Sequence, residues 1–141
     1  MAKLDRSGKP MILHAERVAG RGENPEERIV GWLHDVVEDT HWTLEDLKNE
    51  GFQEEVVEAI DHLSRREGET YREFIERISR HPLATLVKMN DLKDNRERCE
   101  QLGGDEGIGL ALRYDKALRR LGPLAEIYRQ DRKSRQKTES S

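Results

Sequence analysis

The sequence lacks the features that mark secreted and membrane-spanning proteins. Its 141 residues include a single cysteine, Cys99, so no disulfide bond can form within the chain, which is typical of a reducing compartment. No apolar run approaches the roughly 18 residues that a transmembrane helix needs, and the first residues do not carry the apolar segment of a signal peptide. We therefore expect a cytoplasmic protein with no membrane partner.

An excess of basic residues is also missing. The chain has 25 Lys and Arg against 29 Asp and Glu, a net charge of −4, so its overall field does not favour a nucleic acid polymer as a partner. Charged residues make up 38% and hydrophobic residues 34%, but the hydrophobic residues recur periodically, which they do not do in disordered chains. We expect one domain over residues 1–129, followed by a charged, disordered tail over residues 130–141.

The alternation of apolar and polar residues that marks a strand is absent, whereas signals for helix ends are frequent. Asn24 followed by Pro25 is typical of an N-cap and a first helical residue, and predicts a helix that runs to about Glu38. Thr70 and Glu73 have the spacing of a capping box. Further helices are expected around residue 14, over 43–51, 54–65 and 70–78, from 82 past 92, and over about 110–129. The sequence thus predicts an all-α bundle of six to seven helices.

Positive side chains are missing from one acidic segment. No Lys or Arg lies between residues 31 and 40, although this segment contains His34, Asp35, Glu38 and Asp39. On a helix that turns about 100° per residue, these four side chains share one side, opposite the apolar residues of 29–37. A solvated helix face normally carries Lys or Arg that neutralise such acids. The cluster therefore indicates that a metal ion supplies the positive charge.

Two other segments offer residues that would complete a metal shell. His14 lies upstream on its own expected helix, and Asp91 lies in the helix that begins near residue 82. Lys88, Asp91 and Asn95 are spaced i, i+3 and i+7, so they share one polar stripe. An acid, a cation and an amide on one stripe suit a metal-bound phosphate, with Asp91 on the ion and Lys88 and Asn95 on phosphate or ribose oxygens.

The order of these residues resembles a known signature. His14, then the pair His34-Asp35, then Asp91 is similar to the H…HD…D pattern of the HD-domain metal-dependent phosphohydrolases. The resemblance is closest to the RelA/SpoT group, including its small alarmone hydrolases, and covers about residues 8–120. It is carried by His-x-x-x-Val-Ala at 14–19, His-Asp-Val-Val-Glu-Asp-Thr at 34–40, Ser-Arg-Arg-Glu-Gly-Glu at 64–69 and Val-Lys-Met-Asn-Asp-x-x-x-Asn at 87–95.

The resemblance implies an all-α HD fold, a nucleotide substrate and one divalent metal ion, usually Mn²⁺. Four residues would hold this ion, namely His14, His34, Asp35 and Asp91. By the same resemblance, Glu38 and Asp39 would orient or deprotonate the attacking water. The implied reaction removes the 3′-pyrophosphate from (p)ppGpp. Residues expected to contact the substrate are Lys88, Asn95, Arg65 and Arg66.

Two alternative functions keep the same metal ligands. One is an HD nucleotidase that acts on another (deoxy)nucleotide or on a dinucleotide phosphate. The other is a metal- and nucleotide-binding regulatory protein with little turnover, against which the intact pair Glu38 and Asp39 argues. Arg65 and Arg66 also have a structural alternative, because a basic pair at a helix end often only complements the helix dipole.

Members of this group usually begin with a full helix before their first histidine motif, whereas only residues 1–7 precede Gly-Lys-Pro at 8–10 here. We therefore expect an N-terminally shortened bundle with some uncovered apolar surface, which a second copy of the chain would cover in a homodimer. Of the other residues, we expect Trp32 to pack in the core, Cys99 to be structural, and the remaining histidines to lie at the surface.

Overall fold

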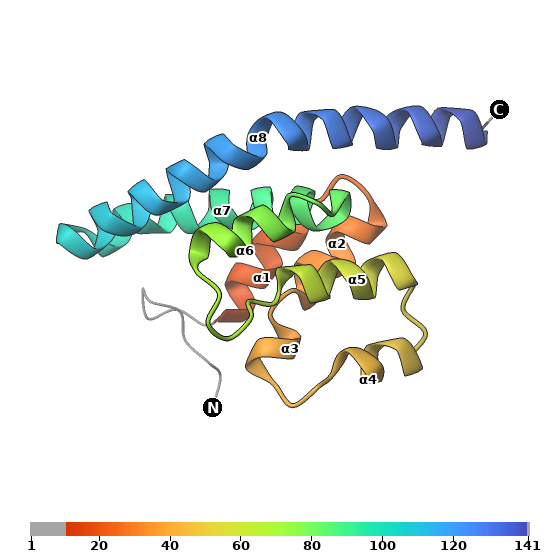
Figure 1. Cartoon of the computed structure of the whole chain (residues 1–141), viewed down its shortest axis with the longest axis horizontal. Helices are drawn as coiled ribbons and strands as arrows, with labels where there is room; N and C mark the ends of the chain where they lie inside the picture. The colour runs from red at the N-terminus through yellow and green to blue at the C-terminus, as the bar shows by residue number, and fades with distance from the viewer. Residues whose placement is uncertain (1–10, 141) are drawn as a thin grey trace.

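The computed structural model describes residues 11–140, with their side chains over 12–135, and this part of the chain is helical without strands. The predicted all-α fold is therefore confirmed (Figure 1). No helix within the described range is long and apolar enough to cross a membrane. The helices are α1 (Met11–Gly20), α2 (Pro25–Leu33), α3 (Val36–Asp39), α4 (Leu44–Asn49), α5 (Glu54–Leu63), α6 (Tyr71–Ile78), α7 (Pro82–Leu102) and α8 (Gly104–Ser140).

Helix α7 is the centre of the fold. It contacts α8 on one side and α1, α2, α5 and α6 on the others, while α3 and α4 lie farthest from α8 (Figure 1). The apolar faces of these helices meet around α7, and burial of that surface is the main force that holds them together. Side chains with no solvent exposure line this core, among them Val18, Val30, Ile60, Ile78, Leu83, Leu92 and Leu121.

The predicted helix starts are confirmed where a capping residue carried the prediction. Asn24 accepts a hydrogen bond from the backbone N–H of Glu27, with Pro25 in the first turn of α2. Thr70 and Glu73 form the capping box of α6, in which each side chain accepts from the backbone N–H of the other residue. Each such cap satisfies backbone N–H groups that the helix itself leaves free and contributes about 1 kcal/mol.

The helix predicted from Asn24 to Glu38 is broken, so the expectation of one continuous helical face is wrong. Helix α2 ends at Leu33, His34 and Asp35 form a turn, and α3 adds a single further turn. His34 Nδ1 donates to the carbonyl oxygen of Gly31 at 2.6 Å, an acceptor that an unbroken helix would offer to the backbone of Asp35. This break divides one expected helix into two and brings the total to eight over residues 11–140.

Gly31 allows α2 to approach α1 closely. A Cβ atom at this position would lie 2.9 Å from the backbone N and Cα of Ala19, a distance that no side chain tolerates without a shift of the backbone. The two helices therefore touch backbone to backbone at this point. As a result, His14 on α1 and His34 after α2 lie within reach of each other.

Helix α8 is longer than predicted. The chain reverses from α7 into α8 at Gly103 and Gly104, whose φ angles of +63° and +64° are in the left-handed region that glycine favours. Helix α8 therefore starts at Gly104 instead of near residue 110, and it continues over residues 130–140, for which we expected a disordered tail.

Ion pairs explain the continuation of α8. Arg129 contacts both carboxylate oxygens of Glu27, at 2.8 and 2.9 Å, and Glu27 has no solvent exposure. Arg132 contacts Glu55 of α5 at 2.6 Å. These contacts join α8 to α2 and α5, and the expectation from the sequence did not include them because the partners lie far apart along the chain.

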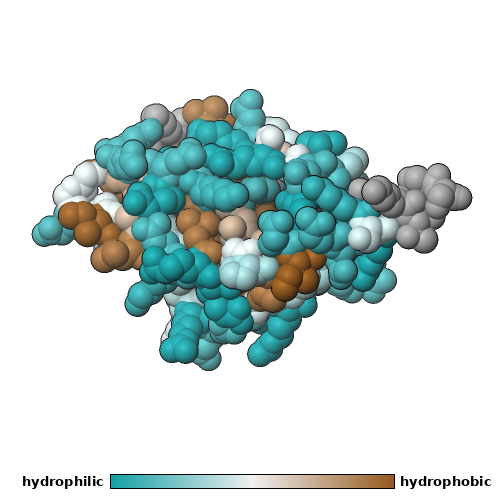
Figure 2. Space-filling model, turned by 90° about the horizontal axis from the view of Figure 1, so that it is seen from above, coloured by the Kyte–Doolittle hydropathy of each residue, from teal (hydrophilic) through white to brown (hydrophobic). Residues whose placement is uncertain are grey.

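The face shown in Figure 2 is mainly hydrophilic, with small separate apolar areas. Trp32 is 44% exposed, so its predicted place in the core is wrong, whereas Cys99 is buried as expected. Residues 8–10, which carried the expectation of a shortened N-terminus, lie outside the described residues. The homodimer stays a prediction.

Candidate metal centre

The four predicted metal ligands lie together, although 77 positions separate the first from the last. His14 Nε2 lies 2.8 Å from Asp91 Oδ1, and His34 Nε2 lies 3.4 Å from the same oxygen and 3.2 Å from Asp35 Oδ2. The potential ligand atoms of three residues, His14, His34 and Asp35, all lie within 4.8 Å of one another. Helix α1, the turn after α2, and α7 thus each contribute to one cluster, which is buried except for Asp35.

Hydrogen bonds hold both imidazole rings with Nε2 directed toward the cluster. His14 Nδ1 donates to Asp94 Oδ2 at 2.5 Å, and His34 Nδ1 donates to Gly31 O at 2.6 Å. With their protons on Nδ1, both rings would offer the Nε2 lone pair to a metal ion. His34 Nε2 is buried and faces Asp35 Oδ2 at 3.2 Å and Asp91 Oδ1 at 3.4 Å without a well-formed hydrogen bond. A buried polar atom of this kind is costly unless a cation or donor reaches it, so the donor set fits a divalent metal.

The electrostatics of the cluster also favour a cation. Burial acts to lower the pKa of His34, but its close contacts with Asp35 and Asp91 and the charges of these carboxylates raise it to about 10. Burial acts to raise the pKa of Asp91, yet Lys88 and the two histidines hold it well below its usual value. Two imidazoles and two carboxylates suit a six-coordinate, hard-to-borderline ion better than a closed structural zinc site.

Lys88 lies against the cluster. Its Nζ donates to Asp91 Oδ2 at 2.8 Å and sits 5.1 Å from the centre of the Phe74 ring. Although burial acts to lower its pKa, the charge of Asp91 raises it, so Lys88 remains a cation. Lys88 therefore orients Asp91, leaving Oδ1 toward the histidines. Its predicted contact with substrate remains a prediction.

The predicted water-handling pair lies on α3, outside the buried cluster. Glu38 and Asp39 are both exposed. Glu38 Oε1 accepts a hydrogen bond from the backbone N–H of Arg65 at 2.6 Å, which ties α3 to the loop between α5 and α6. Glu38 thus has one oxygen held by the protein. Its second oxygen has no such bond.

The structure separates the two arginines predicted to contact substrate. Arg65 lies 5.8 Å from the Tyr71 ring and donates to the carbonyl oxygen of Glu69. Arg66 turns back toward α5, where it contacts Asp61 at 2.5 Å. The ion pair with Asp61 therefore gives Arg66 a structural role. Of these two arginines, Arg65 is the one that lies near an aromatic side chain, that of Tyr71.

Asn95, the last residue of the polar stripe on α7, accepts a hydrogen bond from Arg98 and is not bonded to the metal cluster. In its place the structure reveals Asp94, 1% exposed, as a direct neighbour of His14. Arg17 Nε contacts the other oxygen of Asp94 at 2.5 Å. Asp94 was not among the predicted site residues, because 80 positions separate it from His14 and no local pattern links them.

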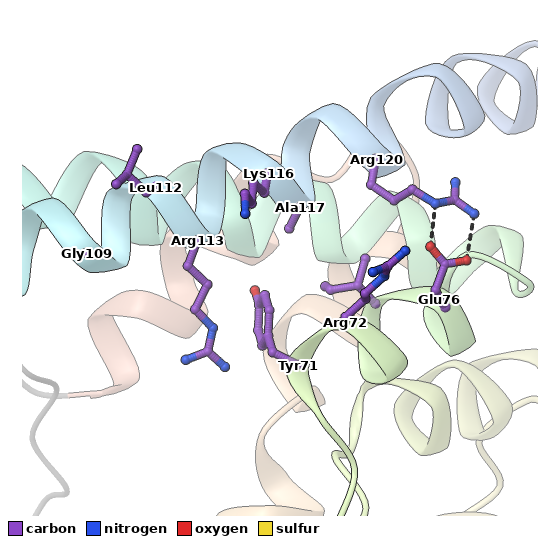
Figure 3. A pocket seen from close by; sticks show the side chains of 10 residues that line it. Tyr71, Arg72, Glu76, Gly109, Leu112, Arg113, Lys116, Ala117 and Arg120 are labelled. Atoms are coloured by element: carbon purple, nitrogen blue, oxygen red, sulfur yellow. Dashed lines mark hydrogen bonds and ion pairs between the residues drawn. The ribbon is translucent and has the colours of Figure 1, made fainter.

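A groove between α6 and α8 is lined in part by Tyr71 (Figure 3). Its volume is about 730 Å³. The Arg113 guanidinium of α8 stacks 3.6 Å from the centre of the Tyr71 ring. Sequence reasoning missed both residues, since a single Tyr and a single Arg on separate helices carry no motif.

Comparison with known proteins adds the class of enzyme that the chain resembles. No protein-family model matches it. It is 35% identical over 107 residues to a probable GTP pyrophosphokinase of Mycobacterium leprae, a stretch that covers 67% of this chain and 14% of that protein. It is also 31% identical over 102 residues to a guanosine-3′,5′-bis(diphosphate) 3′-pyrophosphohydrolase of Aquifex aeolicus, covering 64% and 14% respectively.

A GTP pyrophosphokinase of Streptomyces coelicolor is 30% identical over 103 residues, 64% of this chain and 12% of that protein. The chain thus spans about one seventh of the length of the relatives it matches. The names of these relatives describe both a hydrolase and synthetases that act on guanosine nucleotides.

Proposed function

We propose that this protein is a metal-dependent phosphohydrolase that acts on a nucleotide, with removal of the 3′-pyrophosphate from (p)ppGpp as the leading reaction. The observation that carries the proposal is the cluster of His14, His34, Asp35 and Asp91, buried except for Asp35, in which His34 Nε2 faces two carboxylates without a well-formed hydrogen bond. Similarity to a 3′-pyrophosphohydrolase supports the hydrolytic direction.

Each residue of the cluster has a defined part in this proposal. A divalent ion held by His14, His34, Asp35 and Asp91, which we propose to be Mn²⁺, would supply Lewis acidity toward a phosphoryl oxygen and toward water. Asp35 and Asp91 provide the negative charge that retains the ion. The two histidines would hold the ion through Nε2, and the positions left over in a six-coordinate shell would be open to water and substrate.

The remaining polar groups handle the proton and the phosphate. Because the backbone N–H of Arg65 holds Glu38 Oε1, we assign the other oxygen of Glu38 to orient the attacking water and accept its proton. Asp39, the next residue of α3, is assigned to support that water. Lys88 Nζ has one donor on Asp91 and further N–H groups for the phosphate oxygens.

A substrate panel with added Mn²⁺ tests the proposal. Purified protein is incubated with ppGpp, pppGpp, deoxynucleoside monophosphates and a dinucleotide phosphate, and the released phosphate or pyrophosphate is measured. Pyrophosphate from ppGpp supports the leading reaction. Orthophosphate from a mononucleotide identifies the alternative nucleotidase. Absence of product from every substrate refutes the hydrolase.

Two variants separate the metal site from the proton acceptor. We expect Glu38→Gln to keep Mn²⁺ affinity and lose at least about 100-fold in kcat, because the carboxylate acts on the water proton. His41→Ala, at an exposed histidine outside the cluster, is the matched control and should retain full activity. A fully active Glu38→Gln protein would show that the proton goes elsewhere.

A further inference from the structure

The groove between α6 and α8 has a charge opposite to that of the chain as a whole. Four cations and one carboxylate line it, a formal charge of +3 on a protein whose net charge is −4. They are Arg72, Arg113, Lys116, Arg120 and Glu76. Cations gathered in a concave surface concentrate the positive potential there and attract anions from solution. The volume of about 730 Å³ is in the range of small-ligand sites.

Most of this positive charge is not neutralised within the protein. Arg120 makes a two-pronged ion pair with Glu76, at 2.5 and 2.8 Å. Over the described side chains of residues 12–135, no carboxylate forms an ion pair with Arg72, Arg113 or Lys116. Figure 3 shows Arg113 beside the Tyr71 ring and Arg72 on the side of the Arg120–Glu76 pair, where its charge also acts on Glu76. Three cations are therefore available to a ligand.

The inner end of the groove contains polar atoms that lack partners. Arg113 Nε and the Tyr71 hydroxyl are both inaccessible to solvent and make no hydrogen bond. The Arg113 guanidinium stacks on the Tyr71 ring, which fixes its plane and leaves its terminal nitrogens free to donate. A planar guanidinium held in this way is suited to the paired oxygens of a phosphate group.

Tyr71 connects the groove to the metal centre. Its ring centre lies 3.6 Å from the Arg113 guanidinium and 5.8 Å from that of Arg65, whose backbone N–H donates to Glu38. Tyr71 also contacts Phe74 edge to face, and Lys88 Nζ lies 5.1 Å from the centre of the Phe74 ring. A chain of contacts through two aromatic rings thus connects Arg113 of the groove to Lys88 at the cluster.

We propose that the groove between α6 and α8 binds the phosphate groups of a nucleotide, with Arg113 as the main contact and Lys116 and Arg72 beside it. Two sources have this chemistry. One is the substrate itself. Its phosphate groups that do not react would then occupy the groove, and this possibility rests on the proposed function. The other is a separate nucleotide that regulates the metal centre through Tyr71. The proposal that the groove binds phosphate groups holds whichever of these two sources is correct.

Calorimetric titration of the full chain, in the presence of a chelator that keeps metal off the cluster, tests the site with inorganic pyrophosphate and with GTP as probes. We expect both probes to bind and the double variant Arg113→Ala/Lys116→Ala to weaken them at least about tenfold, because at least one charge-assisted contact is lost. Arg119→Ala removes an exposed cation of α8 that does not line the groove and should leave affinity unchanged.

Glu76→Gln tests the proposal through an expected gain in affinity for the probes. It frees Arg120, so both probes should bind about two- to threefold more tightly, in line with a partly exposed ion pair. Because the Glu76 side chain is partly exposed, Glu76→Gln should fold even if the double variant does not, and a thermal melt verifies this. Failure of the probes to bind, or equal binding by the Arg113→Ala/Lys116→Ala and Arg119→Ala proteins, overturns the proposal.

Steady-state kinetics then identifies the source. If the double variant raises KM about tenfold with kcat within about twofold, the groove holds phosphates of the substrate. If KM is unchanged while added GTP alters the rate of the original protein only, the groove holds a separate nucleotide. A chain that binds pyrophosphate in the groove but hydrolyses no nucleotide refutes the proposed function and leaves the binding site standing.

Discussion

The metal centre and the α6–α8 groove differ in how far their charged side chains are paired with opposite charges. In the centre, every carboxylate is held by a neighbouring cation or imidazole, and its contacts come from helices α1 and α7 and the turn after α2. In the groove, three cations lie on α6 and α8 without carboxylate partners among the described side chains. This difference indicates which kind of ligand each region can bind. The centre is prepared for a cation between fixed lone pairs, whereas the groove is prepared for an anion that brings its own negative charge.

The largest expected effect is at a metal ligand. Asp35→Asn removes one carboxylate from the cluster, and we expect Mn²⁺ affinity to fall at least about 100-fold, since loss of even an outer-shell partner costs 10- to 100-fold. Isothermal titration with Mn²⁺ measures this change. Pyrophosphate binding in the groove should remain as it was, so a parallel loss of both would show that the two regions are not independent.

The contact between α1 and α2 should come next in size. Gly31→Ala forces a Cβ against the backbone of Ala19, and we expect a loss of about 2 kcal/mol in the free energy of unfolding together with weaker Mn²⁺ binding. Urea unfolding measures the first effect. Gly20→Ala is the matched control, because nothing lies within 4 Å of its added Cβ. Equal stabilities of the two variants would show that the helices tolerate a wider separation.

A smaller effect is expected at Asp94, which positions His14 through Nδ1. Asp94→Asn keeps the shape of the side chain but removes its charge, and should weaken Mn²⁺ binding about tenfold. The change should appear as lower metal affinity, with kcat at saturating Mn²⁺ close to the original value. A variant with normal affinity would mean that the other neighbours of His14 suffice to fix the ring.

The smallest effect concerns the loop that carries Arg65 between the two regions. The Arg77 guanidinium bonds to Glu69 and lowers the pKa of that carboxyl from 4.5 to about 2. A folded-state pKa below the unfolded one stabilises the fold above about pH 4.5, and this contribution disappears as the pH falls toward 2. Glu69→Gln should therefore lower stability by about 1 kcal/mol at pH 7.

Thermal melts of the original protein and Glu69→Gln across the acid range measure this prediction. The gap between their Tm values should shrink from pH 4.5 toward pH 2. A gap that is constant with pH would assign the loss to packing and not to the charge of Glu69.

Local signals in the sequence allowed correct prediction of helix starts. Asn24, Pro25 and the Thr70–Glu73 pair act on backbone groups within one turn, so their effect does not depend on the rest of the fold. The break at His34 was missed for a different reason. It depends on a side chain that bonds to the carbonyl of Gly31, and helical periodicity carries no information about that competition.

The residues of the site also divide into those that a sequence pattern predicted and those that depend on tertiary contacts. Its four proposed ligands carried a recognisable order along the chain, and the structure brings all four together. Asp94, Tyr71 and Arg113 were not predicted, since each gains its position from a contact with a distant helix. Trp32 shows the reverse error, because an apolar residue on a helix was assigned to the core and lies 44% exposed.

The sequence by itself determined the all-α class, the starts of the helices that have a clear capping residue, and which residues have the chemistry to hold a metal, because these properties depend on residue type and near neighbours. Only the tertiary structure decided that His34 Nε2 faces two carboxylates without a well-formed hydrogen bond, that Asp94 holds His14, and that four cations and a single carboxylate meet between α6 and α8. The physical reason is that burial and charge pairing are made across the packed helices, where residues separated by as many as 102 positions become neighbours.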